Sequence, residues 1–259
     1  MGQSSLSLEK LASDLHGWAN LFQTGSLPKV SSILENVSEK MKSGQIDDRM
    51  LGETLTDLQK SFWDEFCGGV GWKKDILDDI AAILKKGSPK LDLAMTILQR
   101  TKSPQDTLMR VSVAAMGQKD ALTQLYLLAF LYLVLIEGIY DETMRFLYAL
   151  HLHLSSSNTG LDEIKKRFIQ DKVGLSLFNG WNRTVRNGIA HATFSLDPNT
   201  NTAQFDDQIT KKTETLTFDG FRTLSQKLFD VPTAVQLLLI LQVLAPANFH
   251  FALEAAKKA

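Results

Sequence analysis

Four side chains that could handle a phosphate group lie close together in the segment 183–191: Arg183, Arg186, Asn187 and His191. Arginine binds and neutralises phosphate oxygens through its planar guanidinium. Histidine is the side chain that exchanges protons near neutral pH. On a helix that turns about 100° per residue, Arg183, Asn187 and His191 form one row, with Thr184 and Arg186 on its flanks. The pattern predicts a phosphate-handling ridge, in which Arg183 and Thr184 would help to bind the substrate.

The element that must position this ridge is a helix predicted over about residues 175–192. Its apolar residues recur at helical spacing and would face the core: Phe178, Trp181, Val185 and Ile189. Between Leu161 and His191 there are six Lys or Arg residues against three acids, although the whole chain has a net charge of −1. A general attraction to nucleic acid is therefore absent, and the sequence predicts a local basic patch instead.

The stretch Val185-Arg186-Asn187-Gly188-Ile189-Ala190-His191 resembles the motif of the HEPN superfamily. That motif is an arginine, a polar residue that is often asparagine, a short spacer and a histidine. The family also places an acidic or polar residue on an earlier helix, and Glu137 matches this feature at the end of an otherwise apolar helix. The resemblance covers roughly residues 118–257.

This resemblance implies a metal-independent endoribonuclease without cofactor or metal. His191 would exchange a proton with the RNA 2′-hydroxyl or the leaving oxygen, and Arg186 would hold the scissile phosphate. Asn187 would orient the histidine or the phosphate. Glu137 would complete the catalytic set. Family members usually form homodimers with two motifs facing one cleft, and they include toxins and anti-phage defence effectors. Toxins silenced by nucleotide attachment carry a tyrosine where this chain has Thr193, so that route of neutralisation is not expected.

Other interpretations remain open from the sequence. The polar row can be a solvent-facing or subunit-facing helix surface in a non-catalytic HEPN-like dimerisation module, and Glu137 can be paired for structural reasons alone. An unrelated helical adaptor is a third possibility. A second Arg–His pair with family-like spacing, Arg145 and His151, is interpreted as structural because the apolar Phe146 follows Arg145.

The composition limits the remaining classes of protein. The single cysteine, Cys67, cannot form an internal disulfide or a cysteine-rich zinc site, which favours a reducing compartment. The N-terminus lacks the pattern of a secretion signal, so a cytoplasmic location is expected. The longest apolar run, 125–136, is shorter than the roughly 20 residues that a membrane span needs. We therefore expect no membrane partner, and we expect this run to be a helix buried on all sides.

The chain is predicted to be all-α, a multi-helix bundle with a small β-hairpin inserted after the helix of the motif. Helices are expected over about 8–22, 28–41, 51–66, 76–84 and 91–99, and two Ser-Pro pairs then suggest a boundary. This predicts an N-terminal helical region, 1–104, with a possible protein partner, and a HEPN-like domain, 105–259. Alternating residues predict strands at 193–196 and 202–205, and a possible third at 214–218. Helices over 220–229 and 232–257 would close the domain, the second with a break at Pro246.

Overall fold

The structure is a computed structural model that describes residues 27–45, 48–68, 71–86, 91–154 and 157–244, with isolated positions 13, 16 and 19. The chain divides into two compact units. The first unit runs to Gly71 and resumes at Leu238, and the second is Trp72–Leu237. The predicted helix over 8–22 and the predicted break at Pro246 lie outside the described residues.

The first unit contains the helices α2 (Pro28–Lys42) and α3 (Asp48–Phe62), and the π-helical turn η1 (Trp63–Cys67). The predicted helices over 28–41 and 51–66 are confirmed with small shifts in their ends. Pro28 occupies the first turn of α2, where a missing N–H costs nothing. The carboxylate of Glu65 accepts hydrogen bonds from the main-chain N–H groups of Lys29 and Val30 at 2.9 and 3.1 Å, which satisfies two free donors of that turn.

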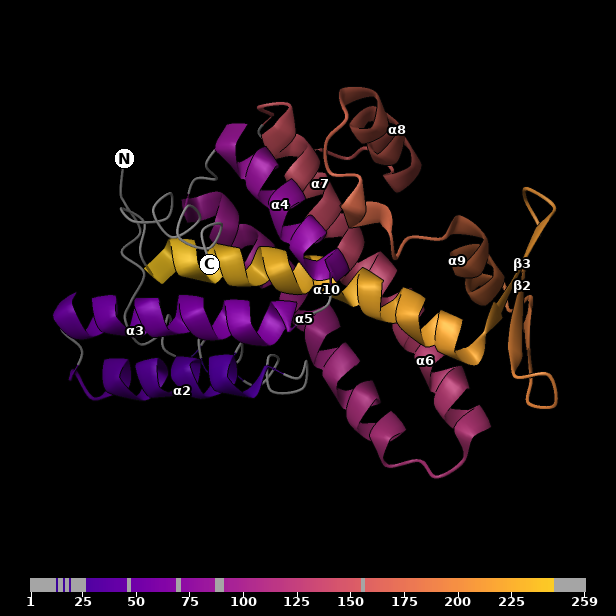
Figure 1. Ribbon diagram of the computed structural model, residues 1–259, viewed down its shortest axis with the longest axis horizontal. Coiled ribbons are helices and arrows are strands. Elements are labelled where there is room, and N and C mark those ends of the chain that lie inside the picture. The colour runs from indigo at the N-terminus through magenta and orange to yellow at the C-terminus, as the bar shows by residue number, and fades with distance from the viewer. Residues whose placement is uncertain are drawn as a thin grey trace. The chain divides into compact units, whose positions relative to one another are not determined.

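The second unit is also mainly helical. Its helical elements are α4 (Gly71–Lys86), α5 (Leu91–Met116), α6 (Ala121–Leu135), η2 (Ile136–Tyr140), α7 (Asp141–His151), α8 (Leu161–Asp171), η3 (Ser176–Phe178), α9 (Arg183–Ala190) and the start of α10 (Phe218–Leu244). The helices α5 and α6 form a hairpin that extends from the rest of this unit (Figure 1).

Two prolines lie inside helices that the sequence predicts to end before them. The helix α5 continues through Pro104, so the prediction of an end at Gln99 is wrong, and the suggested boundary at residue 104 falls within this helix. The proline ring packs closely against Gly138, where an added Cβ would lie 2.6 Å from the Pro104 Cβ. Likewise α10 passes through Pro232 as one helix instead of the two predicted. Tertiary packing therefore overrides the local preference of proline.

The segment Ala121–His151 is continuous, because the π-helical turn η2, which contains Gly138, joins α6 to α7. Among the described residues, this is one helix that is sufficiently long and apolar to cross a membrane, judged by length and composition alone. Of its most apolar 18-residue stretch, 33% is buried. The prediction that α6 is buried on all sides is wrong. Tyr126 and Phe130 remain 48% and 47% exposed.

Three short antiparallel strands follow α9, in the order β1 (Phe194–Asp197), β2 (Thr202–Asp207) and β3 (Lys212–Thr217). Phe194 pairs with Phe205 across β1 and β2, and Phe205 pairs with Glu214 across β2 and β3. The predicted hairpin and its third strand are confirmed, so the fold is mostly helical with a small sheet. The arrangement as a helical bundle remains a prediction.

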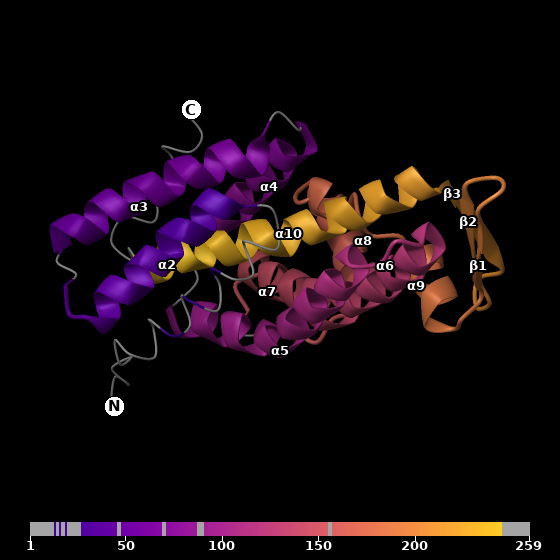
Figure 2. The same cartoon turned by 90° about the horizontal axis from the view of Figure 1, so that it is seen from below.

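The helix α9 packs directly against the middle strand β2 (Figures 1 and 2). Gly188 makes this close approach possible, because a Cβ there would lie 2.9 Å from the Cβ of Phe205 and 3.1 Å from the main-chain nitrogen of Asp206. Phe205 is fully buried and contacts Phe221 of α10 at 5.1 Å between ring centroids. The sheet is thus the surface on which the candidate site is assembled.

Candidate functional site

Two buried tyrosines hold the segment that leads into α9. The Tyr140 hydroxyl donates to the Leu177 carbonyl at 2.8 Å, and the Tyr132 hydroxyl donates to the Gly180 carbonyl at 2.9 Å. Tyr132 also accepts from the N–H of Asn182 at 3.2 Å. Burial raises the pKa of both phenols, so they stay neutral and keep their donors. This segment is a 3₁₀ turn and an irregular stretch, so the prediction of one helix over 175–192 is wrong.

The helix α9 begins at Arg183, where the side chain of Asn182 caps it by accepting from Val185 N–H at 3.2 Å. An asparagine in this position satisfies one of the free donors of the first turn. The face of α9 that carries Asn187 packs against β2.

Arg186 and Glu137 meet, as the resemblance implies. The Nε and Nη2 atoms of Arg186 both approach Glu137 Oε1, at 2.6 and 2.5 Å, and Nη1 donates to Asn187 Oδ1 at 2.8 Å. These contacts use three of the five N–H donors of a guanidinium, so two remain for a ligand. The side chains of Arg186 and Glu137 are 32% and 50% exposed. An ion pair this exposed contributes at most about 1 kcal/mol to stability, so its main effect is to orient Arg186.

Asn187 does not lie on an exposed ridge, contrary to the helical projection. It is buried, with 3% exposure, and its Nδ2 donates to Asp207 Oδ2 at 3.0 Å. The projection failed because β2 covers this face of α9. Asn187 therefore cannot touch a substrate phosphate directly. It connects Arg186 on one side with Asp207 on the other.

The carboxylate of Asp207 is the most heavily bonded group of the site. It accepts from Ile209 N–H at 2.9 Å, Thr210 N–H at 3.3 Å, the Thr210 hydroxyl at 2.7 Å and Asn187 Nδ2 at 3.0 Å. The Thr210 hydroxyl and the other donors hold the pKa of Asp207 well below its ordinary value, against the opposing effect of burial. Sequence analysis missed this residue. The Asp-x-x-Thr spacing signals a local turn, but nothing local signals the contact with Asn187.

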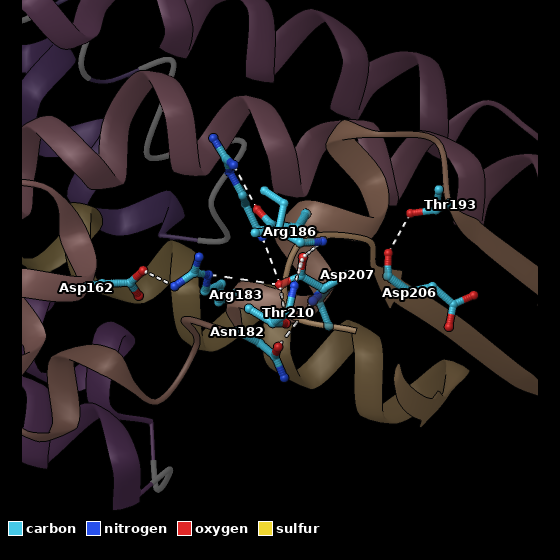
Figure 3. A network of polar contacts seen from close by, with 11 residues as sticks. Asp162, Asn182, Arg183, Arg186, Thr193, Asp206, Asp207 and Thr210 are labelled. Atoms are coloured by element: carbon cyan, nitrogen blue, oxygen red, sulfur yellow. Dashed lines mark hydrogen bonds and ion pairs between the residues drawn. The ribbon is translucent and has the colours of Figure 1, made fainter. Parts of the chain in front are cut away.

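The two residues predicted to bind substrate lie in different environments. Arg183 is 45% exposed, donates to Asp162 Oδ2 at 2.8 Å, and has its Nε 4.0 Å from Asp207 Oδ2 (Figure 3). It lies on the surface beside the network, where a phosphate could compete with Asp162. Thr184 is buried with 8% exposure, so its hydroxyl does not lie on the predicted exposed flank.

His191 is exposed and lies directly after α9, where its main-chain N–H donates to the Asn187 carbonyl at 3.0 Å. In the described part of the chain, no hydrogen bond or ion pair engages its imidazole. The ring is therefore available to an external partner. This contrasts with Arg186 and Asn187, whose side chains are both held in place.

The turn that carries His191 is fixed to the sheet. Ala192 adopts a left-handed conformation with φ +53°, and Thr193 N–H donates to the Gly188 carbonyl at 2.8 Å, which closes the end of the helix. The Thr193 hydroxyl donates to the Asp206 carbonyl at 2.5 Å, and Asp206 N–H donates to the Thr193 carbonyl at 2.9 Å. The position of His191 relative to β2 is thereby set.

The second Arg–His pair makes structural contacts. Arg145 forms an ion pair with Asp141 at 2.8 Å, one turn earlier on α7. His151 is buried and bonds Asp171 at 2.7 Å, while Arg167 bonds the same oxygen at 2.8 Å. Neither side chain lies free at the surface. Within the described residues, no group of three His, Cys, Asp or Glu side chains is placed to hold a metal ion.

No family model, no curated protein and no solved structure matches this chain.

Proposed function

We propose that the chain is a metal-independent endoribonuclease of HEPN type. The observation that carries this proposal is the pairing of a fixed guanidinium with a free imidazole. Arg186 is held by Glu137 and Asn187 and keeps two spare donors, and His191 follows one turn later without a partner in the described chain. Cleavage of a phosphodiester is accelerated by a positioned cation, which stabilises the negative charge of the transition state, and by a side chain that transfers protons.

In the proposed reaction the RNA 2′-oxygen attacks the adjacent phosphorus, and the bond from phosphorus to the 5′-oxygen breaks. One proton leaves the 2′-hydroxyl and one reaches the leaving 5′-oxygen; His191 accepts the first or supplies the second, and water serves in the other transfer. Arg186 donates its free N–H groups to the non-bridging oxygens as negative charge builds on them. Asn187 and Glu137 act through Arg186, which they orient. The products are a 2′,3′-cyclic phosphate, or its hydrolysed form, and a 5′-hydroxyl.

The wider setting belongs to the same proposal. The chain would act in the cytoplasm as a homodimer, as a toxin or an anti-phage defence effector, and the N-terminal helices would bind a protein partner. Exposed apolar side chains on α6, Tyr126 and Phe130, support a subunit contact on the helix that leads to Glu137.

The test is cleavage of labelled RNA in the presence of EDTA by the wild-type protein and by His191→Ala. Loss of an imidazole that moves protons is expected to slow cleavage by about 10²–10⁴-fold. The matched control is His153→Asn, which removes another exposed histidine and keeps a residue that tolerates the positive φ at this position.

Equal cleavage by the wild type and His191→Ala would refute the assignment. If neither protein cleaves any of a varied set of RNAs, the non-catalytic interaction module becomes the better account. The same surface on α6 would then serve assembly alone.

A further inference from the structure

The turn between β2 and β3 presents an unusual combination of exposed side chains beside the site. Ile209 is 65% exposed, the highest value among the large apolar residues that the structure describes. Lys211 and Lys212 follow it and are both exposed. Within the described chain, neither lysine forms an ion pair. The Ile209 side chain therefore offers apolar surface that a ligand could cover, beside two cationic side chains.

The turn is rigid and is built into the network of the site. Asp207 accepts from the main-chain N–H groups of Ile209 and Thr210, and Lys211 N–H donates to the Asp207 carbonyl at 2.8 Å. The other carboxylate oxygen of Asp207 accepts from Asn187 Nδ2 at 3.0 Å. The carboxylate of Asp207 therefore links the main chain of Ile209 to Asn187 of α9. A turn fixed before binding loses little conformational entropy when a ligand arrives.

The charges of this turn suit a polyanion. Its exposed charged side chains are Lys211 and Lys212, since Asp207 is buried and fully bonded. The preceding acid on β2, Asp206, is half-buried, and one of its oxygens accepts from the Thr213 hydroxyl at 2.6 Å. On β3, Glu214 alternates onto the face of Lys212 and is half-buried. With Asp207 ionised, residues 207–212 carry two positive charges and one negative charge, a net of +1, in a chain whose net charge is −1.

We propose that this turn, Gln208–Lys211 with Lys212, is a binding lip for single-stranded RNA, an inference that rests on the proposed function. The lysines contact phosphates on either side of the scissile one, and Ile209 packs on the face of an unstacked base. A duplex keeps its base faces stacked and offers no such contact, whereas single strands expose them. Asp207 is the positioning residue that joins this lip to Arg186 through Asn187.

The experiment measures the binding of a short labelled single-stranded RNA, and of its duplex, to the full chain carrying His191→Ala. The lip variant adds Ile209→Ser, Lys211→Gln and Lys212→Gln. We expect the Kd for the single strand to rise about tenfold or more. Two lost phosphate contacts should also lower the slope of log K against log salt by about 1.4, at about 0.7 per contact for single strands.

The matched control removes an apolar and a cationic side chain elsewhere, Val113→Ser with Lys119→Gln. Val113 is 57% exposed on α5, and Lys119 is exposed in the α5–α6 connection, at the far end of the helical hairpin in Figure 1. This control should bind RNA as the parent does. The duplex should bind more weakly and should lose less affinity in the lip variant.

The lip and the nuclease can fail separately. An unchanged Kd and salt slope in a folded lip variant would overturn the lip, even if the wild-type protein cleaves RNA through His191. Equal losses for the single strand and the duplex would overturn its single-strand preference. A selective loss of single-strand binding, in a protein that cleaves nothing, would support the lip and refute the nuclease.

Discussion

At the scale of single residues, the orientation of Arg186 depends on a series of neighbouring side chains. Arg186 is oriented by Glu137 and by Asn187, and Asn187 is in turn held by Asp207. Such a chain of contacts fixes a guanidinium more firmly than one exposed ion pair could. The two outer residues of this series of contacts differ in exposure, because Glu137 is half-exposed and Asp207 is buried.

Asp207→Asn is predicted to lower the free energy of unfolding by an amount that depends on pH. The pKa of Asp207 is depressed in the folded state, so its stabilising contribution is complete above the unfolded value of about 3.9. It is lost as pH falls further, through the lower folded pKa. The difference between the unfolding free energies of variant and wild type, measured with urea, should therefore become smaller below about pH 4. The control is Asp206→Asn, and a gap that stays constant with pH would contradict this account.

At the scale of elements, part of the architecture could be predicted from local patterns. The helices over 28–41 and 51–66 follow from apolar spacing and Pro28, and the hairpin follows from alternation around Asp197-Pro198-Asn199. The meeting of Arg186 with Glu137 followed from the family resemblance. The burial of Asn187 and the role of Asp207 could not be predicted, since both depend on where β2 packs. The continuity of α5 and α10 through their prolines is likewise set by tertiary contacts.

Tyr132→Phe is predicted to destabilise the approach to α9. It would leave the Gly180 carbonyl and the Asn182 N–H without their partner, at a cost of about 1–3 kcal/mol. Because Asn182 caps α9, RNA cleavage should fall as well. The comparison is Tyr126→Phe, whose hydroxyl is on an exposed side chain. Equal unfolding free energies for both variants would show that Tyr132 does not hold this segment.

Gly188→Ala is predicted to push α9 away from β2. The new Cβ would lie within 3.2 Å of three atoms of Phe205 and Asp206, two of them main-chain atoms that cannot turn aside. Overpacking of this kind costs about 1–3 kcal/mol, and the shift should reduce RNA cleavage. At Gly52, in α3, an added Cβ meets nothing within 4 Å. Gly52→Ala should therefore stabilise the protein by about 0.5–1 kcal/mol. If both variants changed the free energy of unfolding in the same direction, the account of the α9–β2 contact would be contradicted.

At the scale of the whole molecule, the proposed RNA binding would have to rely on local charge, because the net charge is −1. Binding should therefore weaken with salt according to the few phosphates that are contacted, not through a long-range field. A second copy of the chain would double the number of lysines available to RNA, which would give the proposed homodimer a role in binding.

Phe130→Glu is predicted to abolish the proposed homodimer, since it places a charge on a 47% exposed apolar side chain of α6. Light scattering should report twice the chain mass of 28.9 kDa for the wild type and a single chain for the variant. Ile169→Glu, at a 52% exposed position on α8, is the control and should leave the dimer intact. A wild-type protein that is monomeric at all concentrations would refute the dimer.

The most direct test of the central claim uses an RNA that carries a single 2′-deoxy nucleotide at a mapped cleavage site, in EDTA, with wild-type protein and His191→Ala. The account predicts that the wild type stops cutting at the modified position and still cuts unmodified sites to leave cyclic phosphates. It also predicts that His191→Ala cuts neither substrate. Cleavage that ignores the missing 2′-hydroxyl, or that survives in His191→Ala, would contradict the assignment of this site.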